Sequence, residues 1–171
     1  MDDLASVRKK ELTRALTILG VHDFHIYQYS DGNLEDAGEQ IKKTLRSNIQ
    51  EYKPTHVLTL EPNGIYGHPD HIALSKFTKR VVCKPIRLLY VTVSPSYHLP
   101  KSANWMAKKE VIRPILPDME LQLRWPDILT KLKALRAHNS QFMGPLGTVL
   151  KSLTFIMFNH LTANEFFARG N

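Results

Sequence analysis

The chain has 171 residues, of which 43% are hydrophobic and 9% aromatic, and its formal net charge is +7. This length and composition exclude a disordered chain and predict one globular domain over residues 1–171 with a real hydrophobic core. The single cysteine, Cys83, excludes an internal disulfide and suits a reducing compartment. No membrane-length apolar stretch and no signal peptide are evident, so we expect a cytoplasmic protein without a membrane segment.

The predicted elements alternate between helix and strand. In chain order they are helix 5–19, strand 24–29, helix 36–52, strand 55–60, a helix beginning at Pro69 and strand 86–93. This alternation predicts an α/β fold with a mostly parallel sheet and helical crossovers. The first element is a helix, whereas a doubly wound unit normally opens on a central strand. The site therefore looks incomplete from the N-terminal side.

The second half of the chain gives weaker signals. Five prolines between residues 95 and 126 divide it into short pieces, after which we expect a helix over 125–137. Residues 146–158 are strongly apolar and indicate a buried helix or strand. We find no linker, repeat or second domain in the sequence.

The basic residues are dispersed over predicted helices between apolar positions. This dispersion is typical of solvated helix faces, and no zinc knuckle, RNP-like aromatic pair or low-complexity arm accompanies it. We therefore expect no nucleic-acid partner. The weaker alternative, a basic nucleic-acid-binding domain, predicts binding that falls steeply with salt.

The hexamer Tyr66-Gly67-His68-Pro69-Asp70-His71 is where metal-type ligands converge in this sequence. It follows the strand 55–60 and a turn, and Pro69 suits the first turn of the next helix. Ligands of open α/β sheets bind at such strand-to-helix turns. Two imidazoles three residues apart, with a carboxylate between them, can supply a zinc ligand, an acid/base group and a partner that fixes a ring tautomer. The alternative is that both histidines are capping or surface groups.

Several stretches together resemble the LmbE/PIG-L group of zinc-dependent N-deacetylases, which includes N-acetylglucosaminyl-phosphatidylinositol de-N-acetylase. In order, they are Val7-Arg8-Lys9-Lys10-Glu11, Tyr29-Ser30-Asp31-Gly32, the strand before Glu61, Gly67-His68-Pro69-Asp70-His71 and Leu135-Arg136-Ala137-His138-Asn139-Ser140-Gln141. The resemblance covers most of the chain and implies a Rossmann-like three-layer sandwich. The G-H-P-D-H motif is specific, while the flanking stretches persuade by their order.

The resemblance also implies roles for individual residues. His71 matches a zinc ligand, and His68 matches a histidine that acts as general acid or stabilises the oxyanion, with Asp70 as its orienting partner. Tyr66 matches a tyrosine that some members use against the tetrahedral intermediate. The implied cofactor is zinc, and the implied substrate is an N-acetylated amino sugar, either a small molecule or a glycolipid.

Two further positions, Arg8 and Asp31, match residues that contact the sugar in related enzymes. This carry-over is looser than that of the histidines, because the stretches around Arg8 and Asp31 are individually common. We therefore expect both residues to be substrate-binding groups on the strength of the resemblance alone.

One departure from the family bears directly on activity. The family's A-H-P-D-D motif, which supplies two zinc ligands and the general base, does not occur in this sequence. We therefore expect an N-terminally truncated chain that lacks the first strand and its loop and has little or no deacetylase activity, because one histidine cannot hold a three-ligand catalytic zinc. The alternative is a catalytically silent binding or scaffold protein that retains the deacetylase fold.

Overall fold

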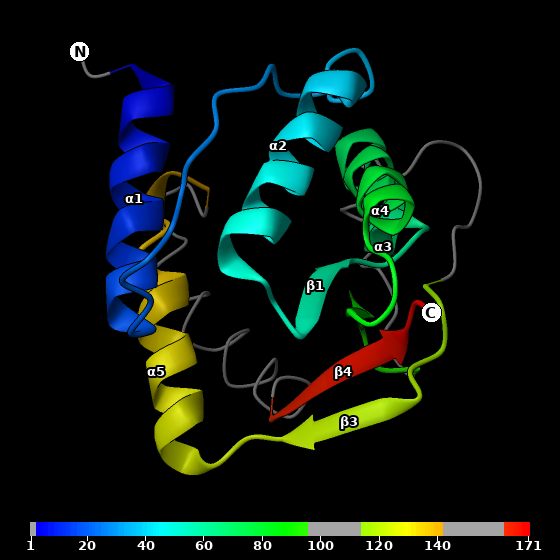
Figure 1. Ribbon diagram of the computed structural model, residues 1–171. Helices are drawn as coiled ribbons and strands as arrows, with labels where there is room; N and C mark the ends of the chain where they lie inside the picture. Colours follow the sequence, from blue (N-terminus) through cyan, green and yellow to red (C-terminus); the bar gives the residue numbers. More distant parts are fainter. Residues whose placement is uncertain (1–2, 96–113, 142–162) are drawn as a thin grey trace. The chain divides into compact units, whose positions relative to one another are not determined.

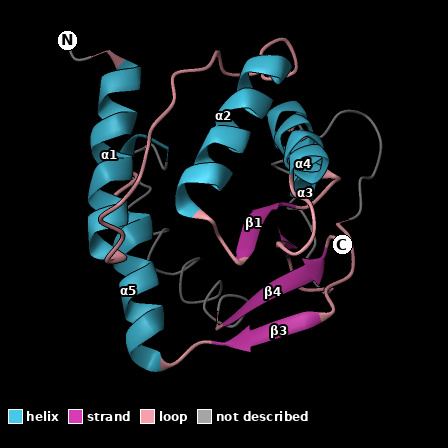
Figure 2. Cartoon of the chain, viewed as in Figure 1, coloured by secondary structure: helices cyan, strands magenta, loops and turns pink. Residues whose placement is uncertain are grey.

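The structure is a computed structural model that describes residues 3–95, 114–141 and 163–171. Within these residues it is mixed α/β (Figure 1, Figure 2). Its sheet has four strands in the order β1-β2-β4-β3. The helices are α1 (Leu4–Ile18), α2 (Gly38–Tyr52), α3 (Gly64–Gly67), α4 (Pro69–Val81) and α5 (Trp125–Arg136). The strands are β1 (His56–Leu60), β2 (Arg87–Thr92), β3 (Met119–Gln122) and β4 (Asn164–Arg169).

The chain divides into two compact units. The first unit comprises Met1–Gln28 and Gln122–Asn164, and the second comprises Tyr29–Leu121 and Glu165–Asn171. None of the helices in the described ranges has the length and apolar character that crossing a membrane requires.

In the second unit, β1 and β2 run parallel, with Val57 opposite Leu88, and β4 pairs with β2 in the antiparallel direction. The apolar core on these strands contains Leu88, Tyr90 and Ala168 and is joined by Val82 from the end of α4. Helix α4 contacts β1, and α2 packs on α4. Because β1 and β2 are parallel, their carboxyl ends lie at one edge of the sheet, where α/β folds build their sites.

The packing of α2 on α4 depends on a glycine at the start of α2. A Cβ atom built on Gly38 would lie 2.7 Å from the Cζ atom of Phe77, a separation that real Cβ contacts do not show. Phe77 is buried together with Ile41 and Ala73 in a second apolar cluster. The close approach of the two helices therefore requires the missing side chain at residue 38.

In the first unit, α1 contacts α5 through small side chains. Ala15 of α1, Ala134 of α5 and Ala137 just after it form a buried cluster, against which Ile18 packs. The carboxylate of Glu11 accepts hydrogen bonds from the main-chain N–H of Ser140, at 2.7 Å, and from its hydroxyl, at 2.6 Å. These bonds tie α1 to the 3-10 turn that follows α5.

Most predicted elements are confirmed. The helices predicted over 5–19, 36–52 and 125–137, the helix beginning at Pro69 and the strands over 55–60 and 86–93 agree with the observed elements within a few residues. The mixed α/β class is confirmed as well. The prediction for residues 146–158 falls outside the described residues, and the single-domain expectation stays a prediction.

Two parts of the sequence-based prediction are wrong or incomplete. The predicted strand over 24–29 is not a strand: these residues have no place in the sheet, and alternating side chains alone do not supply a pairing partner. No sequence pattern indicated β3 and β4, which add an antiparallel part to the sheet. The sequence of β3, Met-Glu-Leu-Gln, does alternate between apolar and polar residues, but the strand is only four residues long and all four are exposed.

Candidate functional site

The site region begins where the chain leaves β1 at Leu60 and turns sharply. Two consecutive residues of this turn, Gly64 and Ile65, have φ values of +67° and +65°, and Gly67 has +82°. Glycine adopts such left-handed conformations readily, but a β-branched residue such as isoleucine does so only when its surroundings enforce it. The turn is therefore held by contacts beyond its own backbone preferences.

His68 forms the N-cap of α4. Its Nδ1 atom accepts a hydrogen bond from the main-chain N–H of Asp70 at 3.2 Å, and Pro69 occupies the first helical position. This satisfies one of the amide donors that every helix start leaves without an intrahelical partner. Because Nδ1 accepts, the neutral ring carries its proton on Nε2. His68 therefore presents an N–H donor on its outer edge.

Asp70 is buried, with 8% of its surface exposed. One carboxylate oxygen accepts the N–H of Gly32 at 2.6 Å, and the other accepts the N–H of Leu34 at 3.1 Å. Both oxygens thus bind the loop that precedes α2, and this loop carries Asp31. Asp70 contacts His68 through its main chain and the distant loop through its side chain.

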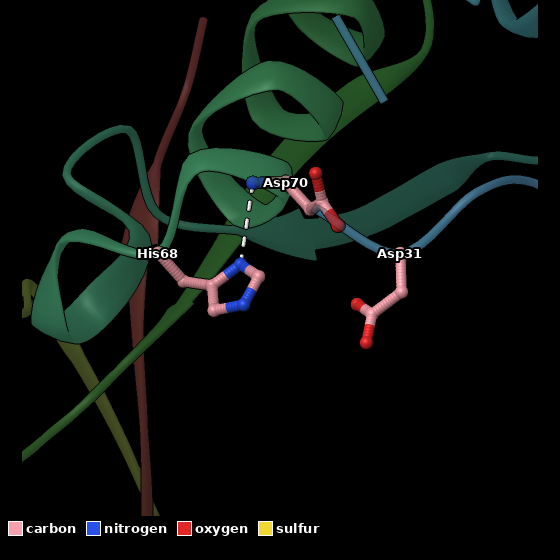
Figure 3. Close-up of side chains that lie close together, drawn as sticks. All are labelled: Asp31, His68 and Asp70. Atoms are coloured by element: carbon pink, nitrogen blue, oxygen red, sulfur yellow. Dashed lines mark hydrogen bonds between the residues drawn. The ribbon is translucent and has the colours of Figure 1, made fainter. Parts of the chain in front are cut away.

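As a result, Asp31, His68 and Asp70 lie close together although they come from two parts of the sequence (Figure 3). Each offers an atom such that the three atoms lie within 4.8 Å of one another, close enough to share a cation after small adjustments. The proton on Nε2 of His68 opposes such a role for this histidine, since a metal ligand needs a free lone pair there.

His71 has the opposite hydrogen-bonding pattern. Its Nδ1 lies 3.4 Å from the carbonyl oxygen of Gly64. A carbonyl can only accept, so Nδ1 carries the proton and Nε2 keeps its lone pair. Burial lowers the pKa of His71, with a smaller contribution from the neighbouring His68, so the neutral ring is favoured. A neutral imidazole whose N–H is bonded to a carbonyl is the form in which histidine binds metals.

The two imidazole rings are neighbours, with centroids 4.7 Å apart and planes inclined by 32°. The backbone thus gives adjacent histidines complementary chemistry: His68 is arranged to donate a hydrogen bond, and His71 is arranged to offer a lone pair. The spacing of three residues between His68 and His71 predicted that the two rings lie close together. The different roles of the two rings follow from the hydrogen-bond partners of their Nδ1 atoms, which the spacing did not predict.

The remaining predicted site residues are not tested by this geometry. Arg8 lies in α1, in the first compact unit. Tyr66 lies in α3, and its side chain is outside the described part of the structure. Their roles stay predictions.

Sequence reasoning treated Glu61 only as part of a turn, although its carboxylate is completely buried beside the site. The available signal was an acidic residue placed directly after an apolar strand and before a proline. Because that pattern alone does not distinguish a buried carboxylate from an exposed turn residue, burial had to be seen in the structure.

Comparison with known proteins confirms the resemblance to the LmbE/PIG-L group. Residues 1–82 match the family model of the GlcNAc-PI de-N-acetylases, PIG-L. Over these residues the chain is similar to the PIG-L (LmbE-like) family. The match includes Asp31, His68, Asp70 and His71.

Two curated relatives illustrate the similarity. The chain is 30% identical over 142 residues to the probable N-acetyl-alpha-D-glucosaminyl L-malate deacetylase 2 of Bacillus anthracis, covering 82% of this chain and 58% of the relative. It is 31% identical over 161 residues to the 1D-myo-inositol 2-acetamido-2-deoxy-alpha-D-glucopyranoside deacetylase of Mycolicibacterium vanbaalenii, covering 81% and 56%. The chain thus spans less than two thirds of the length of these relatives.

Solved structures agree on the fold. The crystal structure of the A40926 pseudoaglycone deacetylase superimposes with a TM-score of 0.68 at 24% sequence identity, covering 99% of this chain and 73% of that one. At this identity the likeness concerns the architecture, which is the Rossmann-like fold of LmbE-type deacetylases.

Proposed function

We propose that this chain carries the hydrogen-bond-donor and metal-ligand histidines of a metal-dependent N-deacetylase site for N-acetylated amino sugars. The observation that supports this is the opposite hydrogen bonding of two adjacent rings: Nδ1 of His68 accepts from the main chain, whereas Nδ1 of His71 donates to it. Amide hydrolysis needs both functions side by side, because one group must interact with the metal and another with the developing oxyanion.

The metal proposed for the site is zinc, with His71 as its ligand through Nε2. When zinc is bound by three protein ligands, it lowers the pKa of its bound water to about 7 and so supplies a nucleophile at neutral pH. The residues of this chain fit that group only in part. His71 matches one ligand, but the sequence contains no A-H-P-D-D motif to supply two more and a general base.

His68 is proposed to bind the oxygen of the tetrahedral intermediate that forms when water adds to the acetamide carbon. Its Nε2–H donates to the oxyanion, while Nδ1 stays bonded to the N–H of Asp70. Protonation of Nδ1 would break that bond, so the geometry favours a neutral donor over a cationic general acid. In a site that also held the general base, the base would take a proton from the attacking water and pass it to the amine nitrogen as the carbon–nitrogen bond breaks, giving acetate and the protonated amine.

Asp31 is proposed to bind the sugar. Its carboxylate lies within 4.8 Å of ligand atoms of His68 and Asp70, so a sugar whose acetamide is bound by His68 would be within its reach. Carboxylates accept hydrogen bonds from sugar hydroxyls. The names of the curated relatives, which specify glucosaminyl and glucopyranoside compounds, support a substrate of this class. Arg8 is kept as a second proposed sugar contact.

We further propose that this chain binds such a sugar without hydrolysing it, because two ligands and the base of the expected zinc site have no counterpart in its sequence. A silent binding protein with the deacetylase fold is the second candidate function, and the same absence supports it. An inactive deacetylase chain and a silent binding protein both predict that the sugar binds around His68 and is not hydrolysed by this chain.

The test combines metal analysis, acetate release and binding. We expect the purified chain to hold much less than one equivalent of zinc and to release no acetate from an N-acetylglucosaminide. In a titration with that sugar monitored by NMR, signals of Asp31 and His68 should shift, and Asp31→Asn should weaken binding about tenfold. The matched control is Asp36→Asn, at an exposed position of the same loop region. One equivalent of zinc together with turnover would overturn the proposed inactivity, and unshifted signals would overturn the proposed site.

A further inference from the structure

Glu61, the first residue after β1, has 0% of its surface exposed. A buried carboxylate is costly to desolvate unless hydrogen-bond donors surround it. It occupies the position between the last residue of β1 and the left-handed turn that precedes the site histidines. The hydrogen-bond donors around the Glu61 carboxylate therefore indicate its role.

Three main-chain N–H groups donate to the Glu61 carboxylate. One oxygen accepts from Asn63 at 3.1 Å and from Ile115 at 3.2 Å, and the other accepts from Ile65. Hydrogen bonds to an ionised carboxylate are among the stronger ones in proteins. The carboxylate thus binds two amides of the turn that follows it and one amide of a segment 54 residues later in the chain.

Two of the turn's residues link these bonds to the site. Ile65 has a φ of +65°, which a β-branched residue does not adopt on its own, and its N–H is bonded to Glu61. Gly64, at φ +67°, directs its carbonyl oxygen to Nδ1 of His71. The orientation of that carbonyl therefore depends on the turn conformation that Glu61 maintains.

We propose that Glu61 is a positioning residue for His71. It holds the Gly64 carbonyl in place, the carbonyl keeps the proton of His71 on Nδ1, and Nε2 is left with the lone pair that a divalent metal needs. Glu61 itself contacts neither ring in these bonds and acts through the backbone. This inference rests on the proposed function only in naming a metal as the partner of His71.

The decisive variant is Glu61→Gln, which keeps the shape of the side chain. The amide has one acceptor oxygen, and its NH₂ group would face a main-chain N–H, so the three bonds cannot all persist. In the metal-free chain labelled with ¹⁵N-histidine, NMR reports which ring nitrogen carries the proton. We expect the ratio of Nδ1–H to Nε2–H forms at His71 to fall about tenfold, the size of one net hydrogen bond.

Two controls separate positioning from general destabilisation. Glu51→Gln, at an exposed position of α2, should leave the His71 ratio unchanged. His68 serves as an internal control, because its Nδ1 is fixed by Asp70 rather than by the turn. A folded Glu61→Gln protein with an unchanged His71 ratio would overturn the proposal, as would equal changes at both histidines.

A second measurement needs no variant and so does not depend on whether Glu61→Gln folds. In the unmodified chain we expect the amides of Asn63 and Ile65 to exchange with solvent at least tenfold more slowly than unprotected reference peptides. Exchange at the reference rate would contradict the proposal. Both measurements are made without metal or sugar, so a failure of the deacetylase proposal leaves their outcome unaffected.

Discussion

Two carboxylates, one in each compact unit, join segments that are far apart in the sequence, and they do so in different environments. Asp70 is buried and binds two main-chain amides 36 and 38 residues away. Glu11 is partly exposed and binds the amide and hydroxyl of Ser140, 129 residues away. The difference teaches that a carboxylate bonded to distant main-chain groups can shape a site when it is buried, whereas a partly exposed one, for which water competes, only fastens a helix to a turn.

The apolar residues around the two carboxylates also differ, being larger in the unit that contains the buried Asp70. Asp70 lies in a unit whose apolar clusters include Phe77, Leu88 and Tyr90. The buried cluster beside Glu11 consists of alanines, with Ile18 packed against it. Removing a hydrogen-bond acceptor leaves donors in a dry environment in the first case and in a wet one in the second. Substitutions of Asp70 and Glu11 test this contrast, and substitution of Gly64 tests the packing around the site in the second unit.

The largest effect is expected for Asp70→Asn. The amide can accept from one of the two loop N–H groups at most and places an NH₂ against the other, so a buried donor loses its partner. We expect the free energy of unfolding to fall by about 2 to 3 kcal/mol in urea denaturation. Asp36→Asn, at an exposed position, should change it by less than about 0.5 kcal/mol. Equal losses in the two variants would contradict the importance of burial at Asp70.

A smaller effect is expected for Gly64→Ala, with Gly32→Ala as its matched control. Both glycines have positive φ values, +67° and +83°, so both alanine variants incur a backbone cost of about 1 kcal/mol. At Gly64 the new Cβ would also lie 3.0 Å from Ile72 and 3.2 Å from the Cβ of His71, whereas at Gly32 it meets nothing within 4 Å. We expect Gly64→Ala to lower the free energy of unfolding by about 1 kcal/mol more.

Thermal and urea denaturation of both glycine variants measure this difference. A control within the same experiment is the NMR signal of His71, which should move in Gly64→Ala and stay in place in Gly32→Ala. Indistinguishable stabilities would show that the side chains around residue 64 adjust freely, and the turn would then place no steric demand on His71.

The smallest effect is expected for Glu11→Gln in the first unit, and it depends on pH. The hydrogen bond from the Ser140 hydroxyl holds the pKa of Glu11 below its ordinary value of 4.5. The folded state therefore favours the ionised form: its stabilisation is complete above about pH 4.5 and is lost as the pH falls through the lowered pKa. Because water screens this partly exposed group, we expect a shift of the thermal midpoint of about 2 °C at pH 7.

Once the pH has fallen below the lowered pKa of Glu11, the midpoints of Glu11→Gln and the unmodified chain should converge, since Glu11 is then protonated in the folded state as well. Glu51→Gln, on the exposed surface of α2, provides the control and should match the unmodified chain throughout the titration. A gap between Glu11→Gln and the unmodified chain that widens toward acid pH would contradict a stabilising role of the ionised carboxylate.

Local sequence signals predicted the regular elements well where periodicity and a terminating residue coincide. Pro69 and the apolar positions after it indicated α4, and the β-branched run after Pro54 indicated β1. The segment 24–29 shows the limit of such signals, because a strand exists only if another strand offers its backbone for pairing. The same limit hid β3, whose four residues are exposed.

For the site, the sequence by itself determined which groups are present and which stand side by side: His68, Asp70 and His71 share one helix start because of their spacing. It could not determine which ring donates and which offers a lone pair. The tertiary structure decided this, because the N–H of Asp70 and the carbonyl of Gly64 set the two tautomers. It also decided that Asp31 lies beside His68 and that Glu61 is buried, since long-range backbone contacts have no signature in a local pattern.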